Sequence, residues 1–336
     1  MSATRTDAAA SFVRRHRTGL SIIGASLALS PVPLLLGNPW WLGILNLVAL
    51  NAVVVLGLNL FIGYAGQISL GHAAFFGLGA YGSAILSTAG GMPPWAAMPL
   101  TAVGVALTAL IVGVPTLRLS GHYLAMATLG FNIVVHHAFV QWDQVTGGPS
   151  GLTGIPPFGV PGVTFQGETP QYYLLWGTTM VALTLAVNFV RSGLGRGLAA
   201  LAQDEVAAAA MGVDVQRGKI AVFTISAAFA SVGGSLFAHY MGTLTPDTFG
   251  IFASIDFVIM VVIGGLGSLW GSLAGALFVT VLPHVLGPLE EYKDILHGLI
   301  VVGVLLVLPR GLLAGIVETV KSQRVRRAAA ATTPAR

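Results

Sequence analysis

The sequence contains no cysteine and few charged side chains. Cysteine is absent from all 336 residues, which excludes a disulfide framework and thiol chemistry. Asp, Glu, Lys and Arg make up 8% of the chain, whereas soluble globular proteins carry roughly 25%. Apolar residues make up 55%, and the mean hydropathy is +0.83. A protein this poor in charge is expected to face lipid. The net charge of +4 does not imply nucleic-acid binding, because the basic residues flank apolar runs.

Several catalytic signatures are also missing. The chain has no G-x-x-x-x-G-K-[ST] motif, so it does not bind ATP through a P-loop of its own. It has neither H-E-x-x-H nor G-x-S-x-G, which argues against a membrane enzyme. We therefore expect a conduit without catalytic residues, bound cofactor or metal.

Apolar runs long enough to cross a bilayer recur along the chain. The expected spans are 19–36, 40–62, 67–89, 94–113, 122–141, 171–190, 219–242, 254–266, 270–286 and 293–309. The run 254–286 is too long for one span, and Gly264, Gly265 and Gly267 divide it into two shorter helices, the first of which is alternatively re-entrant. The sequence thus predicts an all-α membrane protein, a polytopic bundle of about ten transmembrane helices. A signal peptide would also fit the N-terminus, but no small-residue cleavage site follows it.

The basic residues indicate the orientation. All but one of the 16 Lys and Arg residues fall on one side of this arrangement, Lys293 being the exception. Cytoplasmic loops carry the excess of Lys and Arg, so both termini and the loop 191–219 are expected in the cytoplasm and the loop 142–170 outside. The expected organisation is a basic segment 1–18, one transmembrane domain 19–310, and a basic tail 311–336 that is disordered at its end.

The stretch 59–81 reads NLFIGYAGQISLGHAAFFGLGAY and combines glycines with polar side chains. The residues concerned are Gly63, Gly66, Gly71, Gln67, Ser69 and His72. The glycines permit close approach and a helix break, while the polar groups at membrane depth must face protein or water. Each polar residue alone fits packing between helices, but the cluster favours the wall of a translocation pathway.

Further polar residues lie in other spans. Thr128, Asn132 and His136 are four residues apart and share one face of 122–141, whereas His137 points elsewhere. This stripe favours a pore or a helix contact over a metal site, because no carboxylate or cysteine is near in sequence. Asp256 lies near the outer end of 254–266, where it is either hydrated or part of the pathway.

The loop 191–219 reads RSGLGRGLAALAQDEVAAAAMGVDVQRGK. Its middle, Leu198–Met211, is rich in Ala and Leu and predicts one short helix with Asp204 and Glu205 at its centre. Gly193, Gly195 and Gly197 before it, and Gly212 after it, predict flexible turns. Such a helix held between two spans suits a grip by another protein, and the alternative is a passive linker.

Five stretches carry a family resemblance. They are GLNLFIGYAGQISLGHAAFFGLGAY (57–81), LRLSGHYLAMATLGF (117–131), TGGPSGLTGI (146–155), VIGGLGSLWGSLAGA (262–276) and LPRGL (308–312). In this order, over about residues 45–315, the chain resembles the permease subunits of branched-chain amino acid ABC importers, specifically the LivM type.

The resemblance implies that the loop 191–219 docks a separate ATPase. The matching positions are Asp204, Glu205, Ala207, Ala208 and Gly212, and Val206 departs from the family pattern. It further implies a homologous second permease, two cytoplasmic ATPases that bind ATP and Mg²⁺, an extracytoplasmic solute-binding protein, and a multi-pass location in a bacterial inner membrane. The implied solutes are branched-chain amino acids, with urea or short amides as the alternative. A stand-alone channel or secondary transporter is the rival outside the class.

Overall fold

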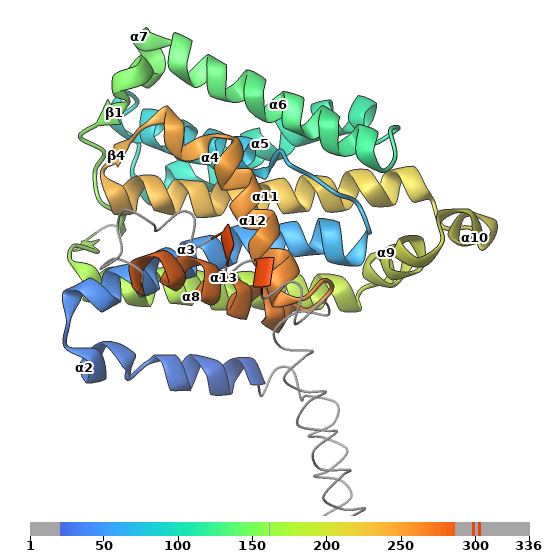
Figure 1. Ribbon diagram of the computed structural model, residues 1–336. Helices are drawn as coiled ribbons and strands as arrows, with labels where there is room; N and C mark the ends of the chain where they lie inside the picture. The colour runs from blue at the N-terminus through green and yellow to red at the C-terminus, as the bar shows by residue number, and fades with distance from the viewer. Residues whose placement is uncertain (1–20, 161, 286–297, 300–301, 304–336) are drawn as a thin grey trace, which may run out of the picture.

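The computed structural model describes residues 21–160, 162–285, 298–299 and 302–303. Within these ranges most of the long helices run roughly parallel or antiparallel to one another, and the helix Ile251–Gly264 crosses them at an angle (Figure 1). Five helices are long and apolar enough to cross a membrane, and they span Pro39–Tyr64, Pro94–Thr116, His122–Gln141, Glu168–Arg191 and Val215–Met241. The chain is therefore an all-α membrane protein. Most of the predicted last span, 293–309, and the segments 1–18 and 311–336 lie outside the described residues.

The helices begin and end close to the predicted spans. In chain order they are a helix over 21–29, α2 (Val32–Leu36), α3 (Pro39–Asn59), α4 (His72–Thr88), α5 (Pro94–Thr116), α6 (His122–Gln141), α7 (Asp143–Thr146), α8 (Glu168–Arg191), α9 (Gly193–Gln203), α10 (Glu205–Ala210), α11 (Val215–Met241), α12 (Ile251–Gly264) and α13 (Leu269–Val285). Local chemistry explains several boundaries. At α3, for example, Pro39 occupies the first turn and Asn38 caps the helix by accepting a hydrogen bond from the Trp40 backbone N–H at 3.0 Å.

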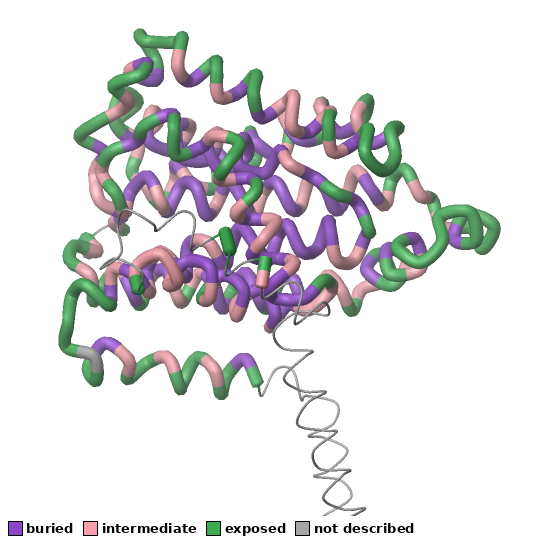
Figure 2. Tube along the Cα trace, in the orientation of Figure 1, coloured by how far each residue is buried: buried purple, intermediate pink, exposed green. Residues whose placement is uncertain are grey.

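Helices α3 and α11 form the centre of the bundle. Helix α11 packs against α3, α4 and α5, while α3 also contacts α8, α12 and α13. Nearly all residues of α3 from Val48 to Asn59 are buried, as the purple segments of Figure 2 show. The outer helices expose apolar side chains instead, such as Ile111 (73% exposed) on α5 and Val134 (67%) on α6. An exposed apolar surface of this kind is what a helix in contact with lipid requires.

The two ends of the bundle differ. At one end α9 and α10 project beyond the long helices (Figure 1, right). At the other end lie α7 and two short antiparallel strand pairs, β1 (Leu152–Thr153) with β4 (Thr243–Leu244), and β2 (Gly159–Val160) with β3 (Val163–Thr164). The 3-10 turns Gly148–Ser150 and Pro246–Phe249 lie in the same connections. The β1–β4 pair therefore fastens the predicted external loop to the connection between α11 and α12.

The predicted span 67–89 is wrong at its start. Helix α3 continues into a π-helix, Leu60–Tyr64, after which residues 66–71 are not helical and α4 begins only at His72. Side-chain groups bind the backbone here, because Thr128 Oγ1 accepts a hydrogen bond from the Leu70 N–H (3.1 Å) and Ser69 Oγ accepts one from the Gly71 N–H (3.3 Å). Gly66, with φ +66°, permits the turn that side chains disfavour.

Helices α12 and α13 form a hairpin. They are separated at residues 265–268, where Gly265 (φ +109°) and Gly267 (φ +72°) adopt conformations that suit glycine. The tip lies against the end of α3, so close that a Cβ on Gly63 would collide with the backbone of Gly267. The far end of α13 returns to the start of α3, where the ring centroids of His284 and Trp40 are 6.4 Å apart. Both ends of the hairpin therefore lie at the β1–β4 end of the bundle.

Candidate functional site

A buried polar network surrounds the start of α4. Its centre is His72, whose Nδ1 lies 3.0 Å from Ser69 Oγ and whose Nε2 lies 2.6 Å from Ser226 Oγ on α11. These three side chains are completely buried. We call this group, together with Thr128, Asn132 and Ser254, the helix-break network. It joins the non-helical segment 66–71 to α4 and α11.

The same network extends to α6 and α12. Ser254 Oγ accepts hydrogen bonds from the Ala73 backbone N–H (3.0 Å) and from Asn132 Nδ2 (3.2 Å). The backbone of Thr128 packs closely against the non-helical segment, since a Cβ on Gly71 would lie only 2.7 Å from the Thr128 carbonyl oxygen. An unpaired backbone donor in an apolar interior is costly, so these side chains stabilise the interruption of the helix.

The structure thus brings together four of the predicted pathway residues, Ser69, His72, Thr128 and Asn132, and it buries all of them. Gln67 lies beside them, 9% exposed, and its Nε2 donates to the Ala65 carbonyl at 3.3 Å. The remaining two lie apart. His136 Nε2 is 3.8 Å from Asp247 Oδ1, and Asp256 is half-buried on α12, near its first turn.

Sequence reasoning missed Asn59, which fixes the tip of the α12–α13 hairpin. Its Nδ2 donates to Ser272 Oγ (2.7 Å) and to the Ser268 carbonyl (3.0 Å), and its Oδ1 accepts from the Gly267 N–H at 2.9 Å. Asn59 is completely buried. The signal was present, since an amide in the apolar run 48–62 needs partners within the protein. Ser226 and Ser254 were missed too, because a single serine in an apolar helix forms no pattern.

The predicted single helix Leu198–Met211 is wrong. Two helices, α9 and α10, meet at Asp204, whose extended backbone (φ −155°) ends α9 and whose Oδ1 caps α10 by accepting from the Val206 N–H (2.9 Å) and the Ala207 N–H (3.0 Å). Asp204 is therefore an N-cap and not a mid-helix residue, because its side chain competes with the backbone for donors. Gly212, with φ +85°, follows α10.

The glycines before this segment also differ from prediction. Gly193, Gly195 and Gly197 belong to α9 and do not form flexible turns. Ser192 caps α9 through a hydrogen bond from the Gly195 N–H (3.2 Å), and a Cβ on Gly195 would collide with the carbonyl oxygens of Phe189 and Val190. The close approach of α9 to the end of α8, and not a turn, requires glycine at position 195.

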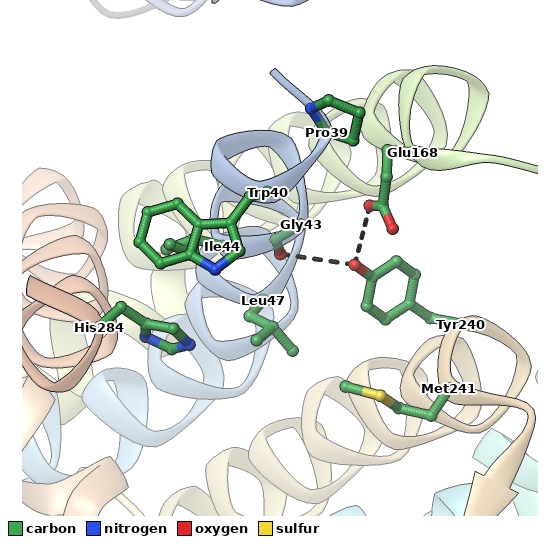
Figure 3. Close-up of a pocket in the computed structure, with 9 residues that line it drawn as sticks. All are labelled: Pro39, Trp40, Gly43, Ile44, Leu47, Glu168, Tyr240, Met241 and His284. Atoms are coloured by element: carbon green, nitrogen blue, oxygen red, sulfur yellow. Dashed lines mark hydrogen bonds between the residues drawn. The ribbon is translucent and has the colours of Figure 1, made fainter. Parts of the chain in front are cut away.

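A second polar group lies at the β1–β4 end, in a pocket of about 370 Å³ (Figure 3). Glu168, at the start of α8, accepts hydrogen bonds on Oε2 from Asn46 Nδ2 (2.8 Å) and from the Tyr240 hydroxyl (3.0 Å). Figure 3 shows Trp40 and His284 on the opposite side of the pocket. These contacts join the ends of α3, α8 and α11.

Long apolar helices, broken helices held by buried polar groups and a projecting pair of short helices define a polytopic membrane permease. Residues 41–305 match the family described as "Branched-chain amino acid transport system / permease component". The chain belongs to this family.

Comparison with individual proteins supports the family assignment. The high-affinity branched-chain amino acid permease protein LivM of Escherichia coli is 32% identical over 293 residues, which cover 80% of this chain and 69% of that protein. The permease protein LivH of Salmonella typhimurium is 26% identical over 78% of this chain and 90% of its own length. The fructose import permease FrcC of Rhizobium meliloti is 33% identical over 37% of each chain. No solved structure matches significantly.

Proposed function

We propose that this chain is a transmembrane subunit of an ATP-binding-cassette importer that moves branched-chain amino acids into a bacterial cell. The family match over residues 41–305 carries this proposal, and the transport of branched-chain amino acids by LivM and LivH supplies the solute class. The chain would lie in the inner membrane with both termini in the cytoplasm, as the distribution of Lys and Arg favours.

The proposed complex contains a homologous second permease, two ATPases and an extracytoplasmic solute-binding protein. This chain would bind no cofactor, and ATP and Mg²⁺ would be held by the ATPases, which fits the absence of a P-loop motif from its sequence. Nucleic acid has no place in this assembly. The resemblance of the chain to both LivM and LivH supports a pair of related permeases.

The α9–α10 projection is the proposed ATPase contact. Ala208 is buried (3% exposed), whereas Val206 (80%) and Met211 (81%) present apolar side chains away from the bundle. Exposed apolar groups on a protruding helix suit the groove of a partner protein. Among the predicted coupling residues, Ala207 would contact the ATPase directly, while Asp204 and Ala208 would hold the shape of α10.

The proposed pathway runs between the two permeases, beside the non-helical segment 66–71. Gln67 would lie nearest to the solute, because it is 9% exposed whereas Ser69, His72 and Asn132 are completely buried. Alternating access would follow when the bundles rock against each other and the broken helices shift as rigid units.

Uptake in proteoliposomes tests the function. The permease pair and ATPases are reconstituted with the binding protein, and leucine, urea, acetamide and fructose are compared as solutes. We expect ATP-dependent leucine uptake. Faster uptake of urea, acetamide or fructose than of leucine would replace branched-chain amino acids as the proposed solute. Fructose is included because the chain partly matches a fructose permease. Flux through this chain alone, without ATP, would instead establish a channel or a secondary transporter.

Docking is tested separately. Val206→Asp should reduce co-purification of the ATPase from mild detergent, because it places a charge on the proposed apolar contact. The matched control is Gln203→Asp, which changes an exposed residue at the end of α9. If both variants co-purify with as much ATPase as the wild-type chain does, α10 is not the ATPase contact.

A further inference from the structure

Lys219 is a buried cation in a bundle whose other buried polar side chains, among the described residues, are neither acidic nor Lys or Arg. It lies in the second turn of α11 and is 3% exposed. Among the described residues classified as buried, it is the only Lys, Arg, Asp or Glu. Removing an ammonium group from water is costly unless a partner compensates it. The position of this side chain therefore depends on its partner.

That partner is Glu205, the first residue of α10. Lys219 Nζ lies 2.6 Å from Glu205 Oε1, and the Glu205 side chain is 46% exposed. The two residues are 14 positions apart in sequence, so the ion pair closes the connection between α10 and α11 into a loop. Glu205 also suits its place at the N-terminus of α10, where the helix dipole favours negative charge.

Helix α10 packs mainly against α9 and makes few other contacts with α11. Apart from Ala208 its residues are exposed, and a groove of about 690 Å³ separates it from the turn at residues 117–120. Arg118 lines this groove but forms no ion pair among the described residues. The Lys219–Glu205 pair is thus the polar tie of α10 to α11. The neighbouring Arg217–Asp214 pair (3.0 Å) is highly exposed and lies within one helix turn, so it fixes nothing between elements.

The tie leads directly to the helix-break network. Ser226, which contacts His72, lies seven residues after Lys219 in α11, which is two helical turns along the same face. We infer that Lys219 is a positioning residue that locks α10 to α11, so that a displacement of α10 reaches the helix-break network as a rigid-body movement of α11. This inference rests on the proposed coupling to ATPases.

Exchange of the two charges tests the inference in the complete reconstituted complex. Lys219→Met and Glu205→Lys each remove the ion pair, and either should lower leucine uptake per ATP hydrolysed by roughly fivefold. The double variant Lys219→Glu/Glu205→Lys restores opposite charges and should recover much of that ratio. Arg217→Met is the matched control and should leave the ratio unchanged. A double variant no better than the single ones, or Lys219→Met with a normal ratio, would overturn the inference.

A second readout does not depend on transport. Because the chain lacks cysteine, one cysteine at the exposed Ala210 can carry a spin label without further changes. Lys219→Met should increase the mobility of this label, and the charge-exchanged variant should restore it. Unchanged mobility in Lys219→Met would refute the lock even where uptake falls. If the wild-type chain does not co-purify with an ATPase, the proposed function itself is refuted.

Discussion

Single polar residues fasten one helix of this bundle to another. Asn59 illustrates the point, because its amide donates to Ser268 and Ser272 and accepts from the Gly267 N–H. In an apolar interior each of these groups would otherwise lack a partner. Asn51, two turns earlier in α3, makes a simpler contact, since within the part of the chain that the structure describes its Nδ2 donates only to Thr280 Oγ1, at 2.9 Å. Asn59 therefore determines where the hairpin tip lies, whereas Asn51 adds one bond to α13.

Replacing these two residues should have unequal effects. Asn59→Leu leaves the Gly267 N–H and the Ser268 carbonyl without their side-chain partner and should lower the free energy of unfolding by about 2–3 kcal/mol. Asn51→Leu should cost only about 0.6 kcal/mol, a usual value for one interhelical bond in a membrane protein. Reversible unfolding in mixed micelles measures both. Equal losses would show that Asn59 has no special place in the packing.

The polar residues of the helix-break network show how far single residues could be predicted from the sequence. Ser69, His72, Thr128 and Asn132 could be selected from the sequence, because polar groups stand out in apolar runs. Their partners could not, since Ser254 meets Asn132 only when the fold brings residues 122 positions apart together. Burial was equally hidden, because the same polar residues suit either a pathway wall or a packed contact.

Helices pack closely where glycine removes the side chain between them. Gly234 on α11 faces α4, where an added Cβ would collide with the Phe76 carbonyl oxygen and lie 2.9 Å from the Ala80 nitrogen. Gly104 on α5 offers the opposite case, because nothing lies within 4 Å of its added Cβ. The chain thus contains a required glycine and a permissive one in similar helices.

This contrast predicts opposite outcomes for one substitution. Gly234→Ala should separate α4 from α11 and cost about 1–3 kcal/mol, as overpacked cores do. Gly104→Ala should be neutral or gain up to about 1 kcal/mol from helix propensity. Their thermal stabilities are compared in detergent, with unfolding monitored by size-exclusion chromatography. A Gly234→Ala variant as stable as Gly104→Ala would contradict the close packing of α4 and α11.

The cap of α10 gives a second test for a single element. Asp204→Ala removes the acceptor of two backbone N–H groups and should destabilise α10 by about 1 kcal/mol. Hydrogen exchange should then rise in residues 205–211 and stay unchanged in α9, which has its own cap at Ser192. Faster exchange throughout α9 would mean that the two helices form one unit and that the cap does not separate them.

Uninterrupted elements were easier to predict than broken ones. The predicted span 122–141 coincides with α6, because a long apolar run has one stable solution in a bilayer. The break at Asp204 was missed, because the Asp204 side chain caps the backbone of α10. The glycines of 59–81 predicted a helix break, but its extent over 66–71 was not predicted, because Thr128 and Ser69 bind the backbone there. The break in 254–286 was predicted, since Gly264, Gly265 and Gly267 lie close together in the sequence and favour the end of a helix.

The basic residues and the α12–α13 hairpin together indicate a topology for the chain. The α9–α10 end carries Arg118, Arg191 and Arg196, and in the proposed orientation these residues lie in the cytoplasm. Helix α12 begins, and helix α13 ends, at the opposite end of the bundle. The tip between them lines a pocket together with Tyr64 and Arg191. The hairpin would therefore reach across most of the bundle while returning to the side on which it starts.

Cysteine labelling of this cysteine-free chain tests that topology. Thr164→Cys, in the loop 142–170, should react with a membrane-impermeant maleimide in intact spheroplasts, whereas Met211→Cys should react only after permeabilisation. Leu266→Cys, at the hairpin tip and 57% exposed, should behave like Met211→Cys although the proposed orientation puts both ends of its hairpin on the outer side. Labelling of Leu266→Cys from outside would mean that the tip does not reach the cytoplasmic side. Labelling of Met211→Cys from outside would invert the orientation and separate α10 from any cytoplasmic ATPase.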